Sequence, residues 1–408
     1  MENKTEGRKQ LLIIGGGYAG FWSAISAIRQ SREIKKTDEL EVTLINPDNY
    51  FTMRPRLYEV SLEGLRIELD KYLKPLGINQ IHGKADTINP EKSEVTVSTA
   101  KGIRHLHYDY LVLATGSSLR ALNLPGIENT FNNDTFNNAL DLENHIIKLA
   151  KNNFANEGDT TFVVAGGGFT GLESVTSIED KAKAMQAKYS TKESKFRIVL
   201  VEKHDVVASF YAAQGQQYII DALKIKNVEV ITGSQVAYVE PSEVLLSDGT
   251  RISTSTVIWT VGLVASPLTY FFKGVKDALN RVSVDSYLKL PAYDNVIVAG
   301  DVANVKVGDD QSAVMSCQFS QFQGRWAGHN AVNDLFGLPL KEYKQPGYTT
   351  CLDLGTNYAL ITEGWDRKTR QTGQAAKATK EWISTDLIYP SIDIEEAVAE
   401  SFPAIPNF

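Results

Sequence analysis

Leu11-Leu-Ile-Ile-Gly-Gly-Gly-Tyr-Ala-Gly20 and Phe162-Val-Val-Ala-Gly-Gly-Gly-Phe-Thr-Gly171 are two copies of one pattern, in which a short apolar run leads into G-x-G-x-x-G. Each apolar run predicts a buried strand, and each copy is followed by a predicted helix, at 21–32 and 172–188. A strand, a glycine-rich turn and a helix in this order are typical of a dinucleotide-binding unit. Because the pattern occurs twice in matched surroundings, we predict two such units rather than a plain glycine-rich turn.

The glycines of each motif are expected to have three different roles. These are a tight turn, a close approach of the backbone to a pyrophosphate, and close packing of the helix on the strand. The pyrophosphate would then lie at the positive N-terminus of the helix. In this order the glycines are Gly15, Gly17 and Gly20 in the first copy, and Gly166, Gly168 and Gly171 in the second.

The strand after each unit should end in a side chain that binds a ribose hydroxyl. The strand predicted at 41–45 leads to Asn46, and the strand predicted at 197–201 leads to Glu202. A carboxylate at Glu202 favours NADH over NADPH because it would repel a 2′-phosphate. Asn46 can also hydrogen-bond a ribose, although less strongly than an acid. The alternative for Glu202 is a solvated strand end.

Three later segments also end strands in residues suited to a nucleotide. Tyr110-Leu-Val-Leu-Ala-Thr-Gly116 and Val257-Ile-Trp-Thr-Val-Gly262 are apolar runs that end in glycine, where backbone can approach a ligand. Asn295-Val-Ile-Val-Ala-Gly-Asp301 places one carboxylate at the carboxyl end of a strand, the edge at which open α/β sheets bind ligands. By itself, a Gly-Asp pair would more often be a turn.

Composition narrows the class of protein. With 408 residues, 43% hydrophobic and 22% charged, the chain is expected to fold into more than one globular domain. A net charge of −7, without a block of like charges, gives a nucleic-acid partner no support. The polar start, 1–10, lacks a signal-peptide core, and the most apolar window, 257–272, is too interrupted to span a membrane. We therefore expect a cytoplasmic protein.

Cysteine and histidine usage excludes several kinds of site. The chain has Cys317 and Cys351, which lie far apart and without the spacing of a zinc site or a redox dithiol. The six histidines show no metal-ligand spacing, so no metal site is predicted. Redox chemistry would therefore depend on a bound cofactor, and Cys317 is interpreted as a small buried thiol.

In their order, the two glycine motifs, Ala-Thr-Gly116 and Gly-Asp301 resemble the two-dinucleotide flavoprotein superfamily that contains glutathione reductase. Over about residues 10–335 the chain resembles the type II NADH dehydrogenases and the related apoptosis-inducing-factor-like oxidoreductases. The narrower resemblance rests on the segments 49–60, 168–173, 246–252 and 256–268. It implies an α/β fold with two Rossmann-like domains and a small cap. The expected domains are an FAD-binding domain at 1–120 and 290–335, an NADH-binding domain at 121–289, and a C-terminal cap on the acceptor side at 336–408.

The resemblance also implies which residues bind which cofactor, with the nicotinamide stacked on the flavin. The FAD site would comprise Gly15, Gly17, Gly20, Asn46, Arg54, Thr115, Gly116, Gly300, Asp301 and Gln318, with Asp301 on the ribityl chain. The NADH site would comprise Gly166, Gly168, Gly171, Glu173, Glu202 and Gly262. The catalytic residues would be Glu173, Gln318 and Lys380.

Alternatives remain for two of these catalytic residues. Glu173 could simply complement a helix dipole, and Lys380 could be an ordinary exposed helix lysine. Gln318 matches the first glutamine of the family segment A-Q-x-A-x-Q, but Phe322 stands where the second is expected. Cys317 and Ser320 replace its alanines, so a quinone acceptor is in doubt.

An aromatic stripe and the C-terminal tail also bear on the acceptor. Phe319, Phe322 and Trp326 could line an acceptor pocket, but near-helical spacing favours a core-facing stripe. The resemblance thins over 336–408. Because 383–408 shows no long apolar helical face, membrane contact is expected to be peripheral at most, at the inner face.

The leading hypothesis is that NADH reduces FAD, which passes two electrons to a quinone-like small molecule. One alternative is a soluble NAD(P)H-dependent flavoenzyme that acts on a specialised metabolite or on oxygen. A second is a reductase of a small electron-carrier protein, which would need a basic docking face that a net charge of −7 does not favour. A third is an NADH-sensing flavoprotein. A homodimer is compatible with each.

Overall fold

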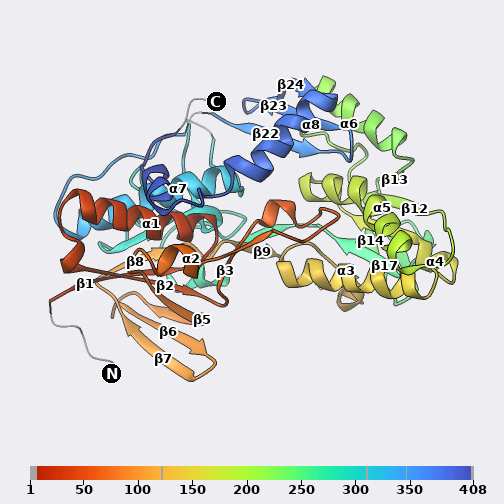
Figure 1. Ribbon diagram of the computed structural model, residues 1–408. Helices are drawn as coiled ribbons and strands as arrows, with labels where there is room; N and C mark the ends of the chain where they lie inside the picture. Colours follow the sequence, from red (N-terminus) through yellow and green to blue (C-terminus); the bar gives the residue numbers. More distant parts are fainter. Residues whose placement is uncertain (1–6, 121–122, 309–310, 346, 406–408) are drawn as a thin grey trace.

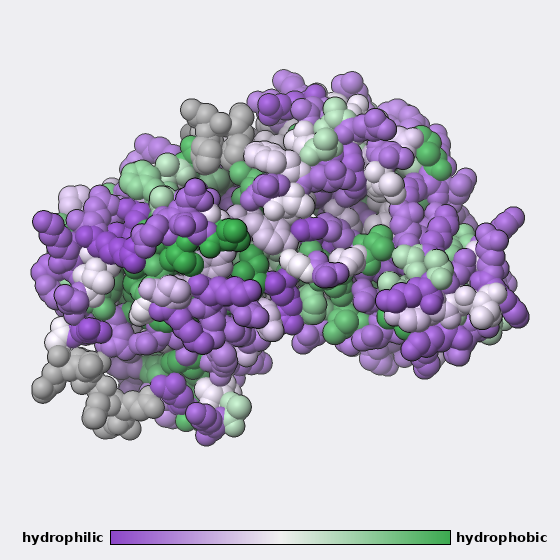
Figure 2. Space-filling model, in the orientation of Figure 1, coloured by the Kyte–Doolittle hydropathy of each residue, from purple (hydrophilic) through white to green (hydrophobic). Residues whose placement is uncertain are grey.

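The computed structural model describes residues 7–120, 123–308, 311–345 and 347–405. Two lobes, each built around a sheet, lie side by side, and the C-terminal sheet lies above them at the top of the view (Figure 1). The face in view is mostly hydrophilic, and its hydrophobic side chains lie in small groups, most clearly on the lobe that carries α1 (Tyr18–Glu33) and α2 (Asp70–Leu73) (Figure 2).

The first lobe contains a seven-stranded sheet in the order β20-β8-β1-β2-β5-β6-β7. The strands from β20 to β5 run parallel, and β5, β6 and β7 form an antiparallel meander. The central strands are almost continuously buried, as expected of parallel strands covered on both faces. In spatial order the strands are β20 (Val296–Val298), β8 (Tyr110–Leu113), β1 (Lys9–Ile14), β2 (Leu40–Asn46), β5 (Asn79–Asn89), β6 (Glu94–Thr99) and β7 (Gly102–His107).

Helix α1 packs closely against α7 (Cys317–Leu335), on the face of this sheet. The two backbones approach each other at glycines of α7. A Cβ on Gly324 would lie 2.4 Å from the carbonyl oxygen of Ala19, and one on Gly328 would lie 2.1 Å from that of Ser23. This contact holds the C-terminal part of the first lobe against its N-terminal nucleotide motif.

The second lobe contains a parallel five-stranded sheet in the order β10-β17-β11-β12-β13. Its strands are β10 (Thr130–Phe131), β17 (Thr256–Trp259), β11 (Thr161–Ala165), β12 (Arg197–Glu202) and β13 (Glu229–Thr232). Its helices are α3 (Phe136–Lys151), α4 (Glu157–Thr160), α5 (Phe169–Tyr189) and α6 (Ala213–Ile225). A small antiparallel sheet joins it, made of β14 (Val236–Val239), β15 (Glu243–Leu246) and β16 (Arg251–Ser253).

Short elements connect the lobes and complete the first one. Two-stranded pairs form between β3 (Tyr50–Thr52) and β4 (Arg66–Glu68), between β9 (Ser117–Leu119) and β18 (Leu263–Ala265), and between β19 (Val282–Ser283) and β21 (Ala303–Asn304). The 3-10 turns are η1 (Thr37–Glu39), η2 (Arg54–Arg56), η3 (Ile127–Asn129), η4 (Pro267–Phe271) and η5 (Gly300–Val302).

The C-terminal segment packs against both lobes. It comprises β22 (Thr349–Asp353), β23 (Ala359–Glu363), β24 (Lys368–Thr372), α8 (Gly373–Trp382), the π-helical turn η6 (Ile383–Leu387) and α9 (Ile394–Glu400). Leu352 and Leu360 belong to the hydrophobic core of the second lobe, whereas Ile388 and Val398 belong to that of the first. No helix in the described ranges is long and apolar enough to cross a membrane.

The predicted α/β fold with two Rossmann-like sheets is confirmed. The helices after the glycine motifs begin at Tyr18 and Phe169, earlier than predicted, because Gly17 and Gly168 are themselves the residues that precede the first helical turn. The chain returns to the first core at Ala265, before the boundary predicted near residue 290. The division into three domains therefore stays a proposal, with its second boundary moved towards residue 265.

Candidate functional site

The first glycine motif has the geometry that its three roles require. Gly15 has φ of +107°, and a Cβ there would lie 2.3 Å from the carbonyl oxygen of Ala114. A Cβ on Gly20 would lie 1.7 Å from the carbonyl oxygen of Gly15, so helix and strand meet too closely for a side chain. A Cβ on Gly17 would meet no described atom within 4 Å. Space therefore lies beside the backbone at the position expected to approach a phosphate.

The second motif repeats this geometry. Gly166 has φ of +103°, and a Cβ on Gly171 would lie 1.8 Å from the carbonyl oxygen of Gly166. At Gly168, as at Gly17, a Cβ would meet no described atom within 4 Å. The helix N-termini behind both open positions can attract a pyrophosphate.

Asn46 and Glu202 are structural counterparts. Each is the last residue of its strand, and each side chain accepts a hydrogen bond from the amide of a motif glycine. The distances are 2.8 Å from Gly16 N to Asn46 Oδ1 and 2.7 Å from Gly167 N to Glu202 Oε2. Glu202 is only 8% exposed, so its interpretation as a solvated strand end is wrong. The two strand ends thus hold a polar side chain against each glycine turn.

Residues around the end of β8 leave a hydroxyl and part of the backbone open to a ligand. The hydroxyl of Thr115 is buried without a hydrogen-bond partner among the described residues, which leaves it available to a ligand. A Cβ on Gly116 would meet no described atom within 4 Å, and its φ is +66°. Gly300, with φ of +79°, lies against Ala19, since a Cβ there would come within 2.9 Å of the Ala19 Cβ. Open backbone and an unpaired hydroxyl are features that a bound nucleotide can use.

Asp301 and Arg54 belong to one hydrogen-bond network. Asp301 accepts hydrogen bonds from the hydroxyls of Ser117, at 2.6 Å, and Ser320, at 3.2 Å. Arg54 donates to the Ser117 hydroxyl at 2.9 Å and forms an ion pair with Asp134. Asp134 lies just before α3, so Arg54 ties the predicted flavin side of the first lobe to the second lobe. Binding of FAD by Arg54 stays a prediction.

Gly262 lies between β17 and β18, and β18 pairs with β9. It has φ of +76°, and its carbonyl oxygen accepts a hydrogen bond from Arg120 N at 2.8 Å. The positive φ explains the glycine, because other residues rarely adopt it. Contact between Gly262 and NADH stays a prediction.

The three predicted catalytic residues meet along one edge of β22. This strand pairs with β23 on one side, and alternate residues present their backbone groups on the other. Thr349 N donates to Gln318 Oε1 at 3.5 Å, Cys351 O accepts from Lys380 Nζ at 3.0 Å, and Asp353 N donates to Glu173 Oε1 at 3.1 Å. One edge therefore gathers side chains from α5, α7 and α8.

Glu173 and Lys380 form a buried ion pair. Lys380 Nζ lies 2.9 Å from Glu173 Oε1, and the two residues are 7% and 5% exposed. Burial raises the pKa of Glu173 to about 7, although the nearby Lys380 acts in the opposite direction. Burial disfavours the charge on Lys380, but the charge and hydrogen bond of Glu173, together with smaller contributions that include Asp353, raise the lysine pKa. The alternative that Lys380 is an ordinary exposed lysine is wrong.

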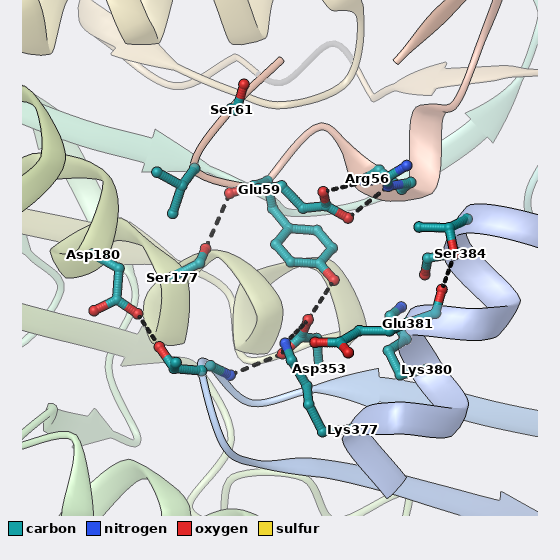
Figure 3. A pocket seen from close by; sticks show the side chains of 15 residues that line it. Arg56, Glu59, Ser61, Ser177, Asp180, Asp353, Lys377, Lys380, Glu381 and Ser384 are labelled. Atoms are coloured by element: carbon teal, nitrogen blue, oxygen red, sulfur yellow. Dashed lines mark hydrogen bonds and ion pairs between the residues drawn. The ribbon is translucent and has the colours of Figure 1, made fainter. Parts of the chain in front are cut away.

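Sequence reasoning missed a polar pocket next to this pair (Figure 3). The pocket has a volume of about 350 Å³, and Tyr58, Asp353, Lys377 and Lys380 are among the residues that line it. The Asp353 carboxylate accepts hydrogen bonds from the Tyr58 hydroxyl at 3.0 Å and from Lys377 Nζ at 2.9 and 2.8 Å. The one available signal was the spacing of Lys377 and Lys380, which places both on one face of a helix.

The aromatic stripe and the cysteines lie in apolar surroundings. Phe319, Phe322 and Trp326 are buried in the first core, which confirms the core-facing interpretation. Burial raises the pKa of Cys317 to about 12 and that of Cys351 to about 11, so both thiols are protonated at neutral pH. Within the described ranges, no group of three or more His, Cys, Asp or Glu side chains is placed to hold a metal ion.

Comparisons with known proteins show the family and the fold. The family model for pyridine nucleotide-disulphide oxidoreductases matches residues 9–324. An NADH dehydrogenase-like protein of Mycobacterium tuberculosis is 36% identical over 94% of this chain and 95% of its own length. A type II NADH:quinone oxidoreductase of Staphylococcus aureus is 26% identical over 86% of this chain and 89% of its own. The structure of NDH2 from Plasmodium falciparum in complex with NADH superposes with a TM-score of 0.77, at 14% identity, and covers 97% of both chains.

Proposed function

We propose that this chain, which belongs to the pyridine nucleotide-disulphide oxidoreductase family and is an NADH oxidoreductase, uses FAD to pass two electrons from NADH to a quinone-like acceptor. The observation that carries the proposal is the meeting of Glu173, Lys380 and Gln318 at the free edge of β22. These side chains come from the second nucleotide unit, the C-terminal segment and the end of the first lobe. Such a junction is where two cofactors and an acceptor would meet.

Residues of the first lobe would hold the flavin. The open backbone at Gly17 and the N-terminus of α1 suit its pyrophosphate, and Asn46 suits the ribose. Asp301, oriented by Ser117 and Ser320, would accept hydrogen bonds from ribityl hydroxyls. A flavin bound there would supply the redox chemistry, because it accepts hydride from a nicotinamide and releases two electrons to an acceptor.

Residues of the second lobe would hold NADH. Gly168 and the N-terminus of α5 suit its pyrophosphate, and Glu202 suits the adenine ribose. Because the carboxylate of Glu202 lies at the turn, a 2′-phosphate there would be repelled, so NADH is the expected donor. The protein's task is orientation and exclusion of water rather than nucleophilic attack.

Glu173, Lys380 and Gln318 would act at the reacting edge. A buried carboxyl with a pKa near 7 can hold a proton and release it at neutral pH. Lys380 holds that carboxyl in place, and the amide of Thr349 orients Gln318. Neither role requires a further catalytic side chain.

A specialised metabolite or oxygen is the second candidate for the acceptor. It is favoured by Phe322, which stands where the resembling family has a glutamine and which lies in the apolar core. The choice of a quinone-like acceptor as the first candidate therefore rests on the named relatives, above all on the S. aureus NADH:quinone oxidoreductase.

Anaerobic stopped-flow measurement tests the proposal. Purified protein should contain FAD, NADH should bleach it faster than NADPH, and a soluble quinone such as menadione should then reoxidise it rapidly. Rapid bleaching followed by fast reoxidation with oxygen, but not with a quinone, would select the second candidate. Absence of a flavin, or of bleaching by NADH, would contradict the proposal altogether.

A further inference from the structure

Helix α3 packs in the hydrophobic cores of both lobes. Near its start, Phe136 packs against the first core and Ala139 lies within it, although the second sheet has already begun with β10. One turn later, Leu142 and Ile146 lie in the second core. The helix also packs against α5, which follows the second glycine motif. In Figure 1, α3 lies along the second lobe with one end at the junction of the two lobes. A single helix thus joins the first lobe to the second nucleotide unit.

An arginine of the first lobe holds the start of this helix. Arg66, in β4, places its guanidinium carbon 3.7 Å from the ring centroid of Tyr50 and 4.5 Å from that of Phe136. A cation over an aromatic ring is attracted by the negative face of the ring, and more strongly where water is partly excluded. The Arg66 side chain is 20% exposed. Because Tyr50 belongs to the first lobe and Phe136 to the helix, the guanidinium bridges the two.

The orientation of Arg66 is fixed on the side of the first lobe. Its Nη2 donates to Asp48 Oδ2 at 2.6 Å. The other carboxylate oxygen of Asp48 accepts hydrogen bonds from Tyr50 N at 3.0 Å and from Asn46 Nδ2 at 3.1 Å. Asn46 is the strand end at the first glycine turn, where the ribose of the flavin nucleotide would lie. The arginine that holds α3 is therefore tied, through one carboxylate, to the predicted flavin site.

A second arginine of the first lobe holds the residues just before the helix. Asp134 forms an ion pair with Arg54, whose Nε also donates to the carbonyl oxygen of Asp134 at 3.1 Å. The Thr135 hydroxyl caps α3 by accepting a hydrogen bond from Asn138 N at 3.2 Å. Two arginines therefore fix the chain on both sides of the helix cap, since Phe136 follows Thr135 directly.

Hydride transfer makes strict demands on the relative position of the two lobes. The proposed flavin site lies in the first lobe and the proposed NADH site in the second, so the separation of the reacting atoms depends on how the lobes are held. Reacting atoms must approach to about 3–3.5 Å, and a displacement of about 1 Å can slow a reaction roughly 10²-fold. A contact that fixes one lobe on the other therefore acts on the rate without touching either cofactor.

We infer that Arg66 and Phe136 are positioning residues for hydride transfer, because their contact fixes the start of α3 on the first lobe and so sets the separation of the flavin from the nicotinamide. The contact adds no chemical step. The hydride that leaves NADH carries both electrons and its one proton to the flavin, and neither residue gains or loses a proton. The inference rests on the proposed function, because that function assigns the flavin to the first lobe and NADH to the second.

The first test measures flavin reduction in the Phe136→Leu holoenzyme. In anaerobic stopped-flow measurements, bleaching at saturating NADH should be roughly tenfold slower than in the wild type. The NADH concentration that gives half the maximal rate, the flavin content and the rate of reoxidation by menadione should be unchanged. Phe136→Tyr keeps an aromatic face for Arg66 and should bleach at the wild-type rate. An unchanged rate in Phe136→Leu, equal slowing in Phe136→Tyr, or a defect confined to NADH affinity would overturn the inference.

A matched control lies at the other end of α3. There Lys151 Nζ lies 5.5 Å from the ring centroid of Tyr189, and both residues belong to the second lobe. Lys151→Ala removes this contact and should bleach at the wild-type rate. A defect as large as that of Phe136→Leu would contradict the assignment, because any contact of α3 would then suffice.

A second variant approaches the same contact from the first lobe, in case Phe136→Leu does not fold. Arg66→Lys keeps a positive charge for Asp48 but lacks the planar group that stacks on the two rings. It should slow bleaching at saturating NADH and leave reoxidation by menadione unchanged. A wild-type rate of bleaching in Arg66→Lys would count against the inference.

The second test does not depend on turnover. Spin labels on Lys84→Cys, in β5, and Ala187→Cys, in α5, report the distance between the lobes by pulsed electron paramagnetic resonance; both positions are exposed. Burial raises the pKa of Cys317 and Cys351, so the native thiols stay protonated during labelling. In the oxidised holoenzyme the distance distribution should be broader for Phe136→Leu than for the wild type or Phe136→Tyr. Equal distributions would overturn the inference. If NADH does not bleach the wild type, the proposed function is wrong and the distance distribution alone decides.

Discussion

Lys380 Nζ lies 2.9 Å from Glu173 Oε1, although 207 residues separate the two in the chain. Both side chains are buried, and the backbone of β22 holds each of them, through Cys351 O and Asp353 N. A buried pair of this kind loses much of its Coulomb attraction to desolvation, so it contributes little net stability. Its presence at the junction of two nucleotide-type lobes is better explained by chemistry than by folding.

Removal of the lysine alone should destabilise the protein more than removal of both partners. Lys380→Met leaves the Glu173 carboxyl buried without its cation, which should lower the free energy of unfolding at pH 8 by about 3–5 kcal/mol. The double variant, which also carries Glu173→Gln, leaves no buried charge at this position and should lie closer to the wild type. Urea unfolding of both variants at pH 8 measures this, and a double variant less stable than Lys380→Met would contradict it.

Protonation of Glu173 should also make the stability of the folded protein depend on pH. Its pKa is raised to about 7 in the folded state, so its protonated form is favoured on folding. The resulting stability is fully present below the ordinary glutamate pKa and is lost as pH rises through 7. Relative to Glu173→Gln, the wild type should lose roughly 3 kcal/mol between pH 4.5 and 8. Urea unfolding across this range is the measurement, and a gap independent of pH would refute the assignment.

Substitution of Asn46 should weaken the binding of the flavin alone, and substitution of Glu202 should weaken the binding of NADH alone. Asn46→Ala should lower flavin retention and leave the KM for NADH unchanged. Glu202→Ala should raise the KM for NADH by roughly 10-fold, the effect of losing a charged hydrogen bond. It should also reduce the preference for NADH over NADPH. Flavin content and steady-state kinetics give both answers. Loss of flavin in Glu202→Ala, with none in Asn46→Ala, would reverse the assignment of the two sites.

The glycines should separate folding from binding. Gly20→Ala places a Cβ 1.7 Å from a backbone oxygen and should lower the free energy of unfolding by about 1–3 kcal/mol or more. Gly17→Ala enters open space and should leave the thermal midpoint of the cofactor-free protein unchanged while it reduces flavin content. Gly171→Ala and Gly168→Ala should repeat this contrast for NADH. Equal thermal midpoints in Gly17→Ala and Gly20→Ala would count against it.

The repeat of the glycine motif was sufficient to predict two nucleotide-type sheets, because strand, turn and helix are local and follow from hydrophobic pattern and backbone freedom. It was less informative about boundaries. Residues 265–289 were predicted to lie in the second domain, but Ala265, Leu268 and Val282 pack in the first core. A return of the chain to an earlier core leaves no local signal, since apolar residues pack equally well in either core.

What the sequence by itself determined is the pair of glycine turns, the strand ends at Asn46 and Glu202, and the candidates Glu173, Gln318 and Lys380, the last three through resemblance. Only the tertiary structure decided that β22 gathers the candidates and that Asp353 and Lys377 face a pocket beside them. The physical reason is range. Turns and strands depend on neighbours in the chain, whereas burial and charge pairing depend on elements that meet only after folding.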